Sequence, residues 1–323
     1  MTAVLRARGL RVTGPSGEAL VGGVDLDLEA GRTLAVVGES GAGKTLTALA
    51  LMGLVPAPAR LDGGSVTLEG REITGLATRD LRAVRGARIA LVPQDPAAAL
   101  DPVMRVGAQI AEVLRVHGGL GRAAARAGAA EALAEVGVTR DDHPHRLSGG
   151  QRQRALIAMA LAPGPRVLVA DEPTASLDPT VQVAVLDLIA RRRAEMGLAV
   201  MLISHDLGSV SRTADAIAVM YAGRVVEEGP ARAVLSAPRH PYTAALMALA
   251  PRLEGRRSLR APIPGSPPEP GSESSGCAFA PRCPARRASC DLSPPPLRPA
   301  GPGRRVACVL THREAAALAG DLA

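Results

Sequence analysis

A glycine-rich segment near the N-terminus has the residue types and spacing of a phosphate-binding loop. Residues 38–45 read Gly-Glu-Ser-Gly-Ala-Gly-Lys-Thr, which matches the pattern G-x-x-x-x-G-K-[ST]. Glycines let backbone N–H groups turn inward around phosphates, Lys44 can reach the β- and γ-phosphate oxygens, and the Thr45 hydroxyl can ligate Mg²⁺. The pattern predicts that eight residues bind a nucleoside triphosphate: Gly38, Glu39, Ser40, Gly41, Ala42, Gly43, Lys44 and Thr45.

The segments on either side of this loop are those that such a loop requires. Residues 33–37 are an aliphatic run typical of a buried strand, and residues 46–54 are an apolar segment with helical character. The helix would add its positive N-terminal end to the phosphate site. A chance glycine-rich turn is therefore the weaker interpretation.

Two further aliphatic runs end in residues that could do chemistry. Asp171 and Glu172 follow the run at 166–170, and His205 follows the run at 198–203. Because ligands of an open parallel sheet bind at the carboxyl ends of its strands, we expect these side chains to face the phosphates. Asp171 could hold Mg²⁺, Glu172 could polarise the attacking water, and His205 could contact the γ-phosphate.

The segment 147–151 reads Leu-Ser-Gly-Gly-Gln ahead of an apolar helix, and it resembles the signature sequence of the ABC ATPase family. A serine and two glycine amides at a helix N-terminus form a second anion cradle. The resemblance implies a head-to-tail dimer with a second ABC ATPase subunit, either the same or a related chain. In that dimer Ser148, Gly149, Gly150 and Gln151 would contact the ATP that Lys44 of the other subunit holds.

Two more segments are similar to motifs of the same family. Gln94 follows an aliphatic run at 89–92 and resembles the Q-loop glutamine, which implies contacts to Mg²⁺ and to the catalytic water. Residues 176–178 read Ser-Leu-Asp and resemble the D-loop, so Asp178 is expected to lie across the dimer. Together the five motifs extend the resemblance over residues 1 to about 235.

The resemblance implies an α/β P-loop NTPase fold of ABC type, with a RecA-like parallel-sheet core. Alternating apolar and polar residues at 24–29 and 65–69 predict strands of an antiparallel β subdomain. Ala/Leu-rich segments at 106–115 and 123–136 predict an α-helical subdomain over about 95–165. We expect a nucleotide-binding domain over 1–260 and a small, irregular, cysteine-containing C-terminal module over 261–323.

A narrower resemblance covers essentially the whole chain. Residues 94–110, residues 239–243 and the tail from 276 to 308 are similar to the ATPases of oligopeptide and dipeptide importers, a family that includes nickel importers. This implies an ATP-hydrolysing subunit that drives peptide uptake through two transmembrane permease subunits, supplied by an extracytoplasmic solute-binding protein. Such a chain would be peripheral, at the cytoplasmic face of the cell membrane. Nickel or another small solute is the alternative cargo.

All four cysteines lie close together near the C-terminus, at Cys277, Cys283, Cys290 and Cys308. A cytoplasmic chain is not expected to hold structural disulfides, so the thiols suggest metal or cluster ligation. Their spacing is wider than the paired knuckles of zinc sites. The family resemblance points to a 4Fe-4S cluster, while zinc and reduced free thiols remain the alternatives.

Composition and length exclude several other classes. The 323 residues are 47% hydrophobic, which is enough for a substantial core, and the net charge of +7 comes from scattered arginines. The aromatic residues are Tyr221, Tyr242 and Phe279, too few for a base-stacking surface, so no nucleic-acid partner is expected. ABC ATPases that act on DNA or ribosomes carry a coiled-coil insertion or two cassettes, and this chain shows neither. Complete ATPase motifs also disfavour a cluster-based redox sensor.

One departure from the family concerns the adenine base. ABC ATPases usually place an aromatic residue near the N-terminus to stack on adenine, and residues 10–14 contain none. We expect aliphatic contact from Val12 or Val21 to replace it, with weaker discrimination of the base.

Overall fold

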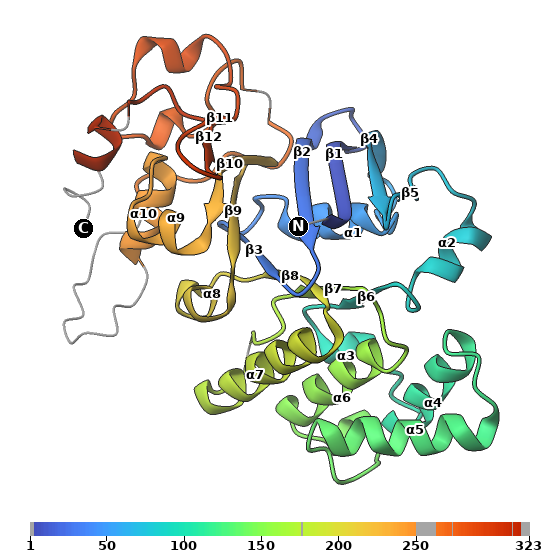
Figure 1. Cartoon of the computed structure of the whole chain (residues 1–323). Helices are drawn as coiled ribbons and strands as arrows, with labels where there is room; N and C mark the ends of the chain where they lie inside the picture. Colours follow the sequence, from blue (N-terminus) through green and yellow to red (C-terminus); the bar gives the residue numbers. More distant parts are fainter. Residues whose placement is uncertain (1–2, 176, 250–262, 273, 312, 318–323) are drawn as a thin grey trace. The chain divides into compact units, whose positions relative to one another are not determined.

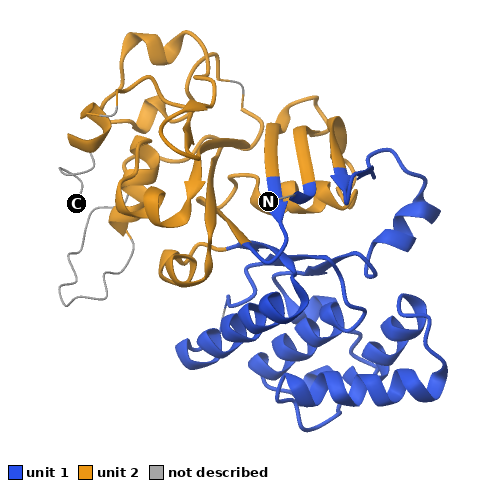
Figure 2. Cartoon of the chain, in the orientation of Figure 1, with its two compact units in different colours: residues 1–5, 27–32, 67–203 blue, residues 6–26, 33–66, 204–323 orange. Residues whose placement is uncertain are grey.

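The computed structural model describes residues 3–175, 177–249, 263–272, 274–311 and 313–317. The chain divides into two compact units, shown in Figure 2. Unit 1 comprises residues 1–5, 27–32 and 67–203, and unit 2 comprises residues 6–26, 33–66 and 204–323. Ser176 and the predicted domain boundary at 260/261 lie outside the described residues.

A small sheet contains the strands predicted from alternating residues. Its order is β2-β1-β4-β5, and β4 pairs with β5 in antiparallel fashion. The strands are β1 (Ala3–Thr13), β2 (Ala19–Glu29), β4 (Arg60–Leu68) and β5 (Arg71–Glu72). Val24, Leu26 and Leu28 of β2 are buried while the residues between them are more exposed, as the alternation predicts. Glu69 was predicted as strand, but its positive φ of 51° places it in the turn after β4.

Unit 1 contains three parallel strands, β6 (Ile89–Val92), β7 (Val167–Asp171) and β8 (Ala199–Ile203). β7 lies in the middle and pairs with both neighbours. Every residue of β7 and β8 is buried, which explains why their sequences are unbroken aliphatic runs. These strands agree with the runs identified in the sequence.

Helices make up most of the rest of unit 1 (Figure 1). They are α2 (Thr78–Val84), α3 (Pro96–Ala99), α4 (Val106–Val116), α5 (Arg122–Glu135), α6 (Gly149–Leu161) and α7 (Pro179–Met196), with a 3-10 turn at Pro144–Arg146. α4, α5 and α6 pack through one apolar core that includes Ile110, Leu133 and Leu156. The two helices predicted around 106–115 and 123–136 are confirmed. Among the described residues, no helix is both long and apolar enough to cross a bilayer.

Unit 2 has a second group of strands, in the order β11-β12-β10-β9-β3. β3 pairs in parallel with β9, whereas β10 is antiparallel to both β9 and β12. The strands are β3 (Thr33–Val37), β9 (Ala216–Tyr221), β10 (Arg224–Pro230), β11 (Arg298–Pro299) and β12 (Arg305–Val306). Its helices are α1 (Lys44–Leu51), α8 (Leu207–Thr213), α9 (Ala231–Ser236) and α10 (Pro241–Leu249), with 3-10 turns η2 (Ala280–Arg282) and η3 (Ala288–Asp291). α1 begins two residues before the predicted 46–54 helix and ends three residues before its predicted end, where Gly53 adopts φ 63° just beyond the cap residue Met52.

The cysteine-containing segment is attached to the sheet of unit 2. β12 adds to the edge of β10, with Glu227 opposite Val306. The Glu227 carboxylate is fully buried and accepts a hydrogen bond from Arg304 Nε at 3.1 Å. Apart from the two-residue strand β11 and a helical stretch at residues 313–317, the described residues of this segment form short turns and irregular structure. Its status as a separate module remains a prediction.

The three aromatic residues of the chain pack together inside unit 2. The ring centroids of Tyr221 and Tyr242 are 4.6 Å apart, and that of Phe279 lies 5.3 and 5.4 Å from them. Such pairs contribute on the order of 1 kcal/mol each beyond the area they bury. The cluster joins β9, α10 and the cysteine segment. His240 lies beside it, 5.9 Å from the Phe279 ring, and its Nδ1 accepts the Tyr242 N–H at 3.0 Å.

We expect the stability of the chain to fall in mild acid because of His240. Burial lowers the pKa of this imidazole from 6.5 to about 4, so it stays neutral in the fold while the unfolded chain protonates. The stability it contributes is present above pH 6.5 and is lost as the pH falls towards 4. Between pH 7.5 and 5 the loss is about 2 kcal/mol. Urea unfolding at the two pH values measures it.

His240→Asn keeps an acceptor for the Tyr242 N–H, but the asparagine does not titrate. Between pH 7.5 and 5 this variant should therefore lose about 2 kcal/mol less unfolding free energy than the wild type. His145→Asn, at an exposed histidine, is the matched control and should behave as the wild type. Equal pH dependence in all three proteins would show that His240 makes no such contribution.

Candidate functional site

The phosphate loop connects β3 to α1 in unit 2. Gly38 is buried, and a Cβ built on it would lie 2.3 Å from the carbonyl oxygen of Met220 in β9. The Gly223 N–H donates to the Ala42 carbonyl at 3.0 Å, and Gly43, with φ 93°, leads directly into α1. The first and last glycines of the motif are thus required by close approach and by backbone conformation.

Lys44 is the first residue of α1 and is only 7% exposed. Its Nζ donates to the carbonyl oxygens of Gly38 and Glu39, both at 2.9 Å. Ser40, Gly41 and Thr45 are exposed. The loop therefore presents an ammonium group, exposed loop residues and a helix N-terminus, as an anion site requires.

Glu39 is bound by two residues that the sequence analysis did not identify. Its N–H donates to the Tyr242 hydroxyl at 2.7 Å. Its carboxylate receives Arg282 Nη1 at 2.6 Å and Nη2 at 3.0 Å. Both partners lie far away in sequence, and only the scarcity of aromatic residues could have drawn attention to Tyr242. The role of Glu39 as an ATP contact stays a prediction, since its side chain is paired within the protein.

In unit 1 the structure brings together Gln94 and Glu172, because Gln94 Nε2 donates to Glu172 Oε2 at 3.1 Å. Asp171 is the buried last residue of β7. Glu172 follows with a positive φ of 46°, and its N–H donates to the Ile203 carbonyl at 3.0 Å. A left-handed glutamate costs on the order of 1 kcal/mol, and such strain is common at functional sites.

Ser148 caps α6 through a reciprocal pair of hydrogen bonds. Its hydroxyl accepts the Gln151 N–H at 3.3 Å, and the Gln151 side chain accepts the Ser148 N–H at 2.9 Å. Ser148 and Gly149 are exposed at the start of the helix. Gly150 has a packing role as well, because an added Cβ would lie 2.7 Å from Val181 Cγ1 of α7. The signature segment thus has the geometry of an anion cradle.

Asp178 and His205 each stand just before a helix. The Asp178 carboxylate accepts the N–H groups of Thr180 and Val181 at the start of α7, so this residue caps a helix. His205 is exposed and follows β8, before α8, which Asp206 caps. The roles predicted for both residues at the nucleotide remain predictions.

The expected replacement of the adenine-stacking aromatic is wrong. Val12 and Val21 are both 0% exposed, so neither side chain has surface left to offer a base. Val12 belongs to β1 and Val21 to β2, and both side chains are part of the protein's core.

The four cysteines are partly or fully buried. Burial raises the pKa of the Cys277 and Cys308 thiols, and raises that of Cys283 to about 11, with neighbouring thiols adding to each shift. The Cys277 N–H donates to the Cys290 carbonyl at 2.7 Å. Yet in the described part of the chain no group of three or more His, Cys, Asp or Glu side chains has the arrangement of a metal site. The geometry alone does not support the predicted 4Fe-4S cluster or zinc.

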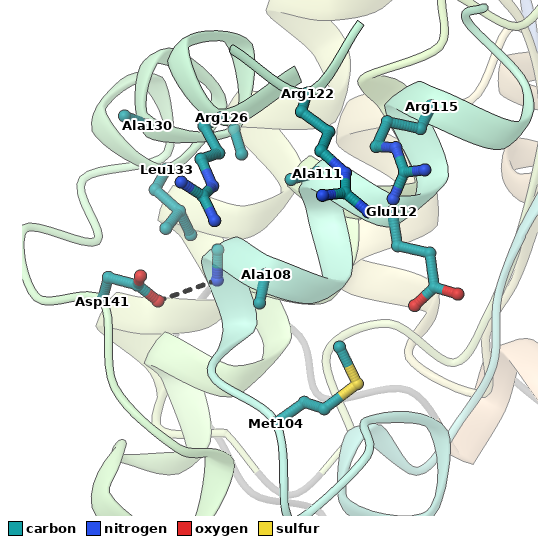
Figure 3. Close-up of a pocket in the computed structure, with 12 residues that line it drawn as sticks. Met104, Ala108, Ala111, Glu112, Arg115, Arg122, Arg126, Ala130, Leu133 and Asp141 are labelled. Carbon is teal, nitrogen blue, oxygen red and sulfur yellow. Dashed lines mark hydrogen bonds between the residues drawn. The ribbon is translucent and has the colours of Figure 1, made fainter. Parts of the chain in front are cut away.

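A pocket of about 660 Å³ lies in the helical part of unit 1 (Figure 3). Arg122 and Arg126 of α5 reach towards α4, which contributes Glu112 and Arg115. At its edge Asp141 Oδ1 accepts the Gly107 N–H at 2.8 Å. In the loop before α4, Val103 is 79% exposed, although it is a large apolar residue.

Two family models match different parts of this chain. The family described as "ABC transporter" matches residues 21–175, and "Oligopeptide/dipeptide transporter, C-terminal region" matches residues 226–290. Among solved structures, cbiO1 from Clostridium perfringens aligns with a TM-score of 0.64 and 26% identity, over 73% of this chain and 92% of its own. The bacterial ABC transporter cassette MJ0796, solved as a dimer, aligns with a TM-score of 0.64 and 25% identity, over 71% and 99%.

The curated relatives cover nearly the whole chain. The oligopeptide transport ATP-binding protein OppD of Salmonella typhimurium is 44% identical over 94% of this chain and 93% of its own length. The probable peptide ABC transporter ATP-binding protein y4tR of Sinorhizobium fredii is 45% identical over 89% and 88%. The chain belongs to the ABC transporter family, as an ATP-binding and ATP-hydrolysing subunit.

We expect Gly38→Ala to destabilise the protein far more than Gly41→Ala. The added Cβ at Gly38 collides with the Met220 carbonyl in the core, which costs about 3 kcal/mol. At Gly41, where φ is +80°, the nearest atom to such a Cβ is Pro270 Cγ at 3.9 Å, so backbone strain alone costs about 1 kcal/mol. Urea unfolding compares the two variants. Similar losses would mean that the approach of β9 does not constrain the loop.

Proposed function

We propose that the chain energises the import of dipeptides or oligopeptides by hydrolysing ATP for a separate permease. The observation that carries this proposal is the match of residues 226–290 to the oligopeptide/dipeptide transporter C-terminal region, on a chain with a complete phosphate loop. The names of OppD and y4tR point the same way. Nickel or another small solute is the alternative cargo.

Each predicted site residue has a role in this proposal. Lys44 binds the β- and γ-phosphates, and Thr45, Gln94 and Asp171 are the residues that would hold Mg²⁺, whose charge would stabilise the transferred phosphoryl group. Glu172 is the general base for the attacking water. The 3.1 Å hydrogen bond from Gln94 supports this assignment, because it orients the carboxylate. His205 contacts the γ-phosphate.

The proposal includes a second ATPase subunit. The Ser148 cap leaves the first amides of α6 at an exposed helix start, and α6 is 13 residues long. We assign this cradle, with Asp178, to the γ-phosphate side of ATP bound by the partner ATPase. A dilute preparation of this chain alone should then hydrolyse ATP slowly.

The permease is the second partner in the proposal. The exposed Val103 lies within residues 94–110, the stretch that is similar to peptide-importer ATPases, and the same stretch contributes Met104, Gly107 and Ala108 to the pocket between α4 and α5. Docking there would hold the chain as a peripheral subunit at the cytoplasmic face of the membrane. A solute-binding protein outside the membrane would supply the cargo.

We expect Glu172→Gln to lower kcat for ATP at least about 100-fold while ATP affinity changes less than about threefold, because only the proton acceptor is lost. The variant should accumulate an ATP-bound dimer, measured by size-exclusion chromatography with ATP and Mg²⁺. Glu131→Gln, at an exposed glutamate of α5, is the matched control and should keep wild-type turnover. Unchanged turnover in Glu172→Gln would remove this residue from the role of base.

The same variant tests the cargo in cells that also make the permease and binding protein. Uptake of a radiolabelled tripeptide should stop in Glu172→Gln and continue in Glu131→Gln. If the wild type takes up labelled nickel and not the tripeptide, the cargo is nickel and the peptide assignment is wrong. The ATPase assignment would be unaffected.

We also propose that Cys277, Cys283, Cys290 and Cys308 ligate a 4Fe-4S cluster. The support for this proposal is that all four cysteines of the chain fall within residues 277–308, with Cys290 and Cys308 buried and Cys277 and Cys283 half-buried. Four thiolates match the ligand requirement of such a cluster. Bound iron would lower the raised thiol pKa values and hold the ligands as thiolates.

We expect anaerobically purified protein to contain about four iron and four sulfide ions per chain, with broad visible absorbance. Cys290→Ser should lose both. One zinc ion per chain without visible absorbance would identify a zinc site instead.

A further inference from the structure

Arg282 uses every N–H of its guanidinium group inside unit 2. Its side chain is only 4% exposed. Nε donates to the Pro264 carbonyl at 3.0 Å, and Nη2 donates to the Ile263 carbonyl at 3.3 Å. Nη1 also donates to the Tyr221 hydroxyl at 3.2 Å. With the two bonds to Glu39, all five donors are satisfied, so the fork is fixed in one orientation.

This guanidinium determines where the Glu39 carboxylate lies. Glu39 is the second residue of the phosphate loop, and its side chain is 25% exposed. The bidentate pair directs both carboxylate oxygens to Arg282, while the Tyr242 hydroxyl holds the Glu39 N–H. The Glu39 carbonyl in turn accepts from Lys44 Nζ at 2.9 Å. Arg282 is thus two contacts away from the ammonium group that binds phosphates.

The Arg282–Glu39 ion pair also balances the negative charge of the glutamate. A triphosphate is strongly anionic, and a glutamate within its binding loop would repel it in a partly desolvated site. A buried guanidinium bound bidentately to that glutamate cancels the charge at short range. Without it, the Glu39 carboxylate would be free to turn towards the phosphates.

We propose that Arg282 is a positioning residue for ATP, which holds the Glu39 side chain away from the phosphates and neutralises its charge. The inference rests on ATP binding at the phosphate loop, which the wild-type protein tests separately. Because Arg282 immediately precedes Cys283, the cysteine segment and the nucleotide loop meet at this ion pair.

A second buried pair of the same segment provides the comparison. Arg304 is 6% exposed in its side chain, and Nε donates to Glu227 Oε1 at 3.1 Å. Its Nη1 donates to the Ala233 carbonyl at 3.0 Å. This pair attaches the segment to β10 and contacts no residue of the phosphate loop. Loss of attachment alone should therefore affect both arginine variants alike.

The test measures binding of the fluorescent nucleotide mant-ATP to the full chain. Arg282→Gln should raise its Kd about tenfold, because an uncompensated carboxylate then lies in the loop. Arg304→Gln should change it by less than about twofold, although both variants lower the unfolding temperature. In Glu39→Gln/Arg282→Gln a neutral amide pair replaces the ion pair, and affinity should return to within about threefold of wild type.

The salt dependence and the kinetic parameters separate positioning from packing. The deficit of Arg282→Gln should shrink at high salt, which screens the carboxylate, and it should raise KM for ATP more than it lowers kcat. Equal weakening by Arg282→Gln and Arg304→Gln, or a double variant no better than Arg282→Gln, would overturn the proposal. If Arg282→Gln does not fold, Arg282→Lys against Arg304→Lys applies the same comparison, since lysine keeps the charge but loses the fork. Equal Kd values for mant-ATP in Arg282→Lys and Arg304→Lys would overturn the proposed role of Arg282.

Discussion

The phosphate loop must keep its backbone in one conformation, and a chain of glycines and small residues does not hold such a shape by itself. The loop is supported from behind by β9, through the Met220 carbonyl against Gly38 and through the Gly223 N–H to Ala42. Arg282 and Tyr242 fix Glu39. These contacts from β9, α10 and the cysteine segment hold the backbone groups of the loop in place.

The local parts of this arrangement could be predicted from the sequence. The strand and helix around the phosphate loop, the buried strands β7 and β8, and the cap of α6 each follow from patterns within a few residues. Aliphatic runs identify strands buried on both faces because no other common element needs them at that length. The pairing of Gln94 with Glu172 follows once their strands are neighbours, since β6 and β7 are adjacent.

The long-range parts could not be predicted, and the reason is physical. Arg282 and Glu39 are 243 positions apart, and no periodicity in either segment indicates that they meet. Val12 and Val21 show the same limit, because the sequence of a strand does not show which other parts of the chain cover its side chains. The cysteines lie close together in the sequence, but their separations in space depend on loops without regular structure.

The aromatic cluster has a consequence for spectroscopy. The chain has no tryptophan, and its two tyrosines are Tyr221 and Tyr242, whose rings are in contact. One hydroxyl accepts from the phosphate loop, and the other accepts from Arg282. The intrinsic ultraviolet emission of the unlabelled protein therefore arises entirely at the place where the nucleotide loop meets the cysteine segment, so the molecule carries its own optical reporter for that junction.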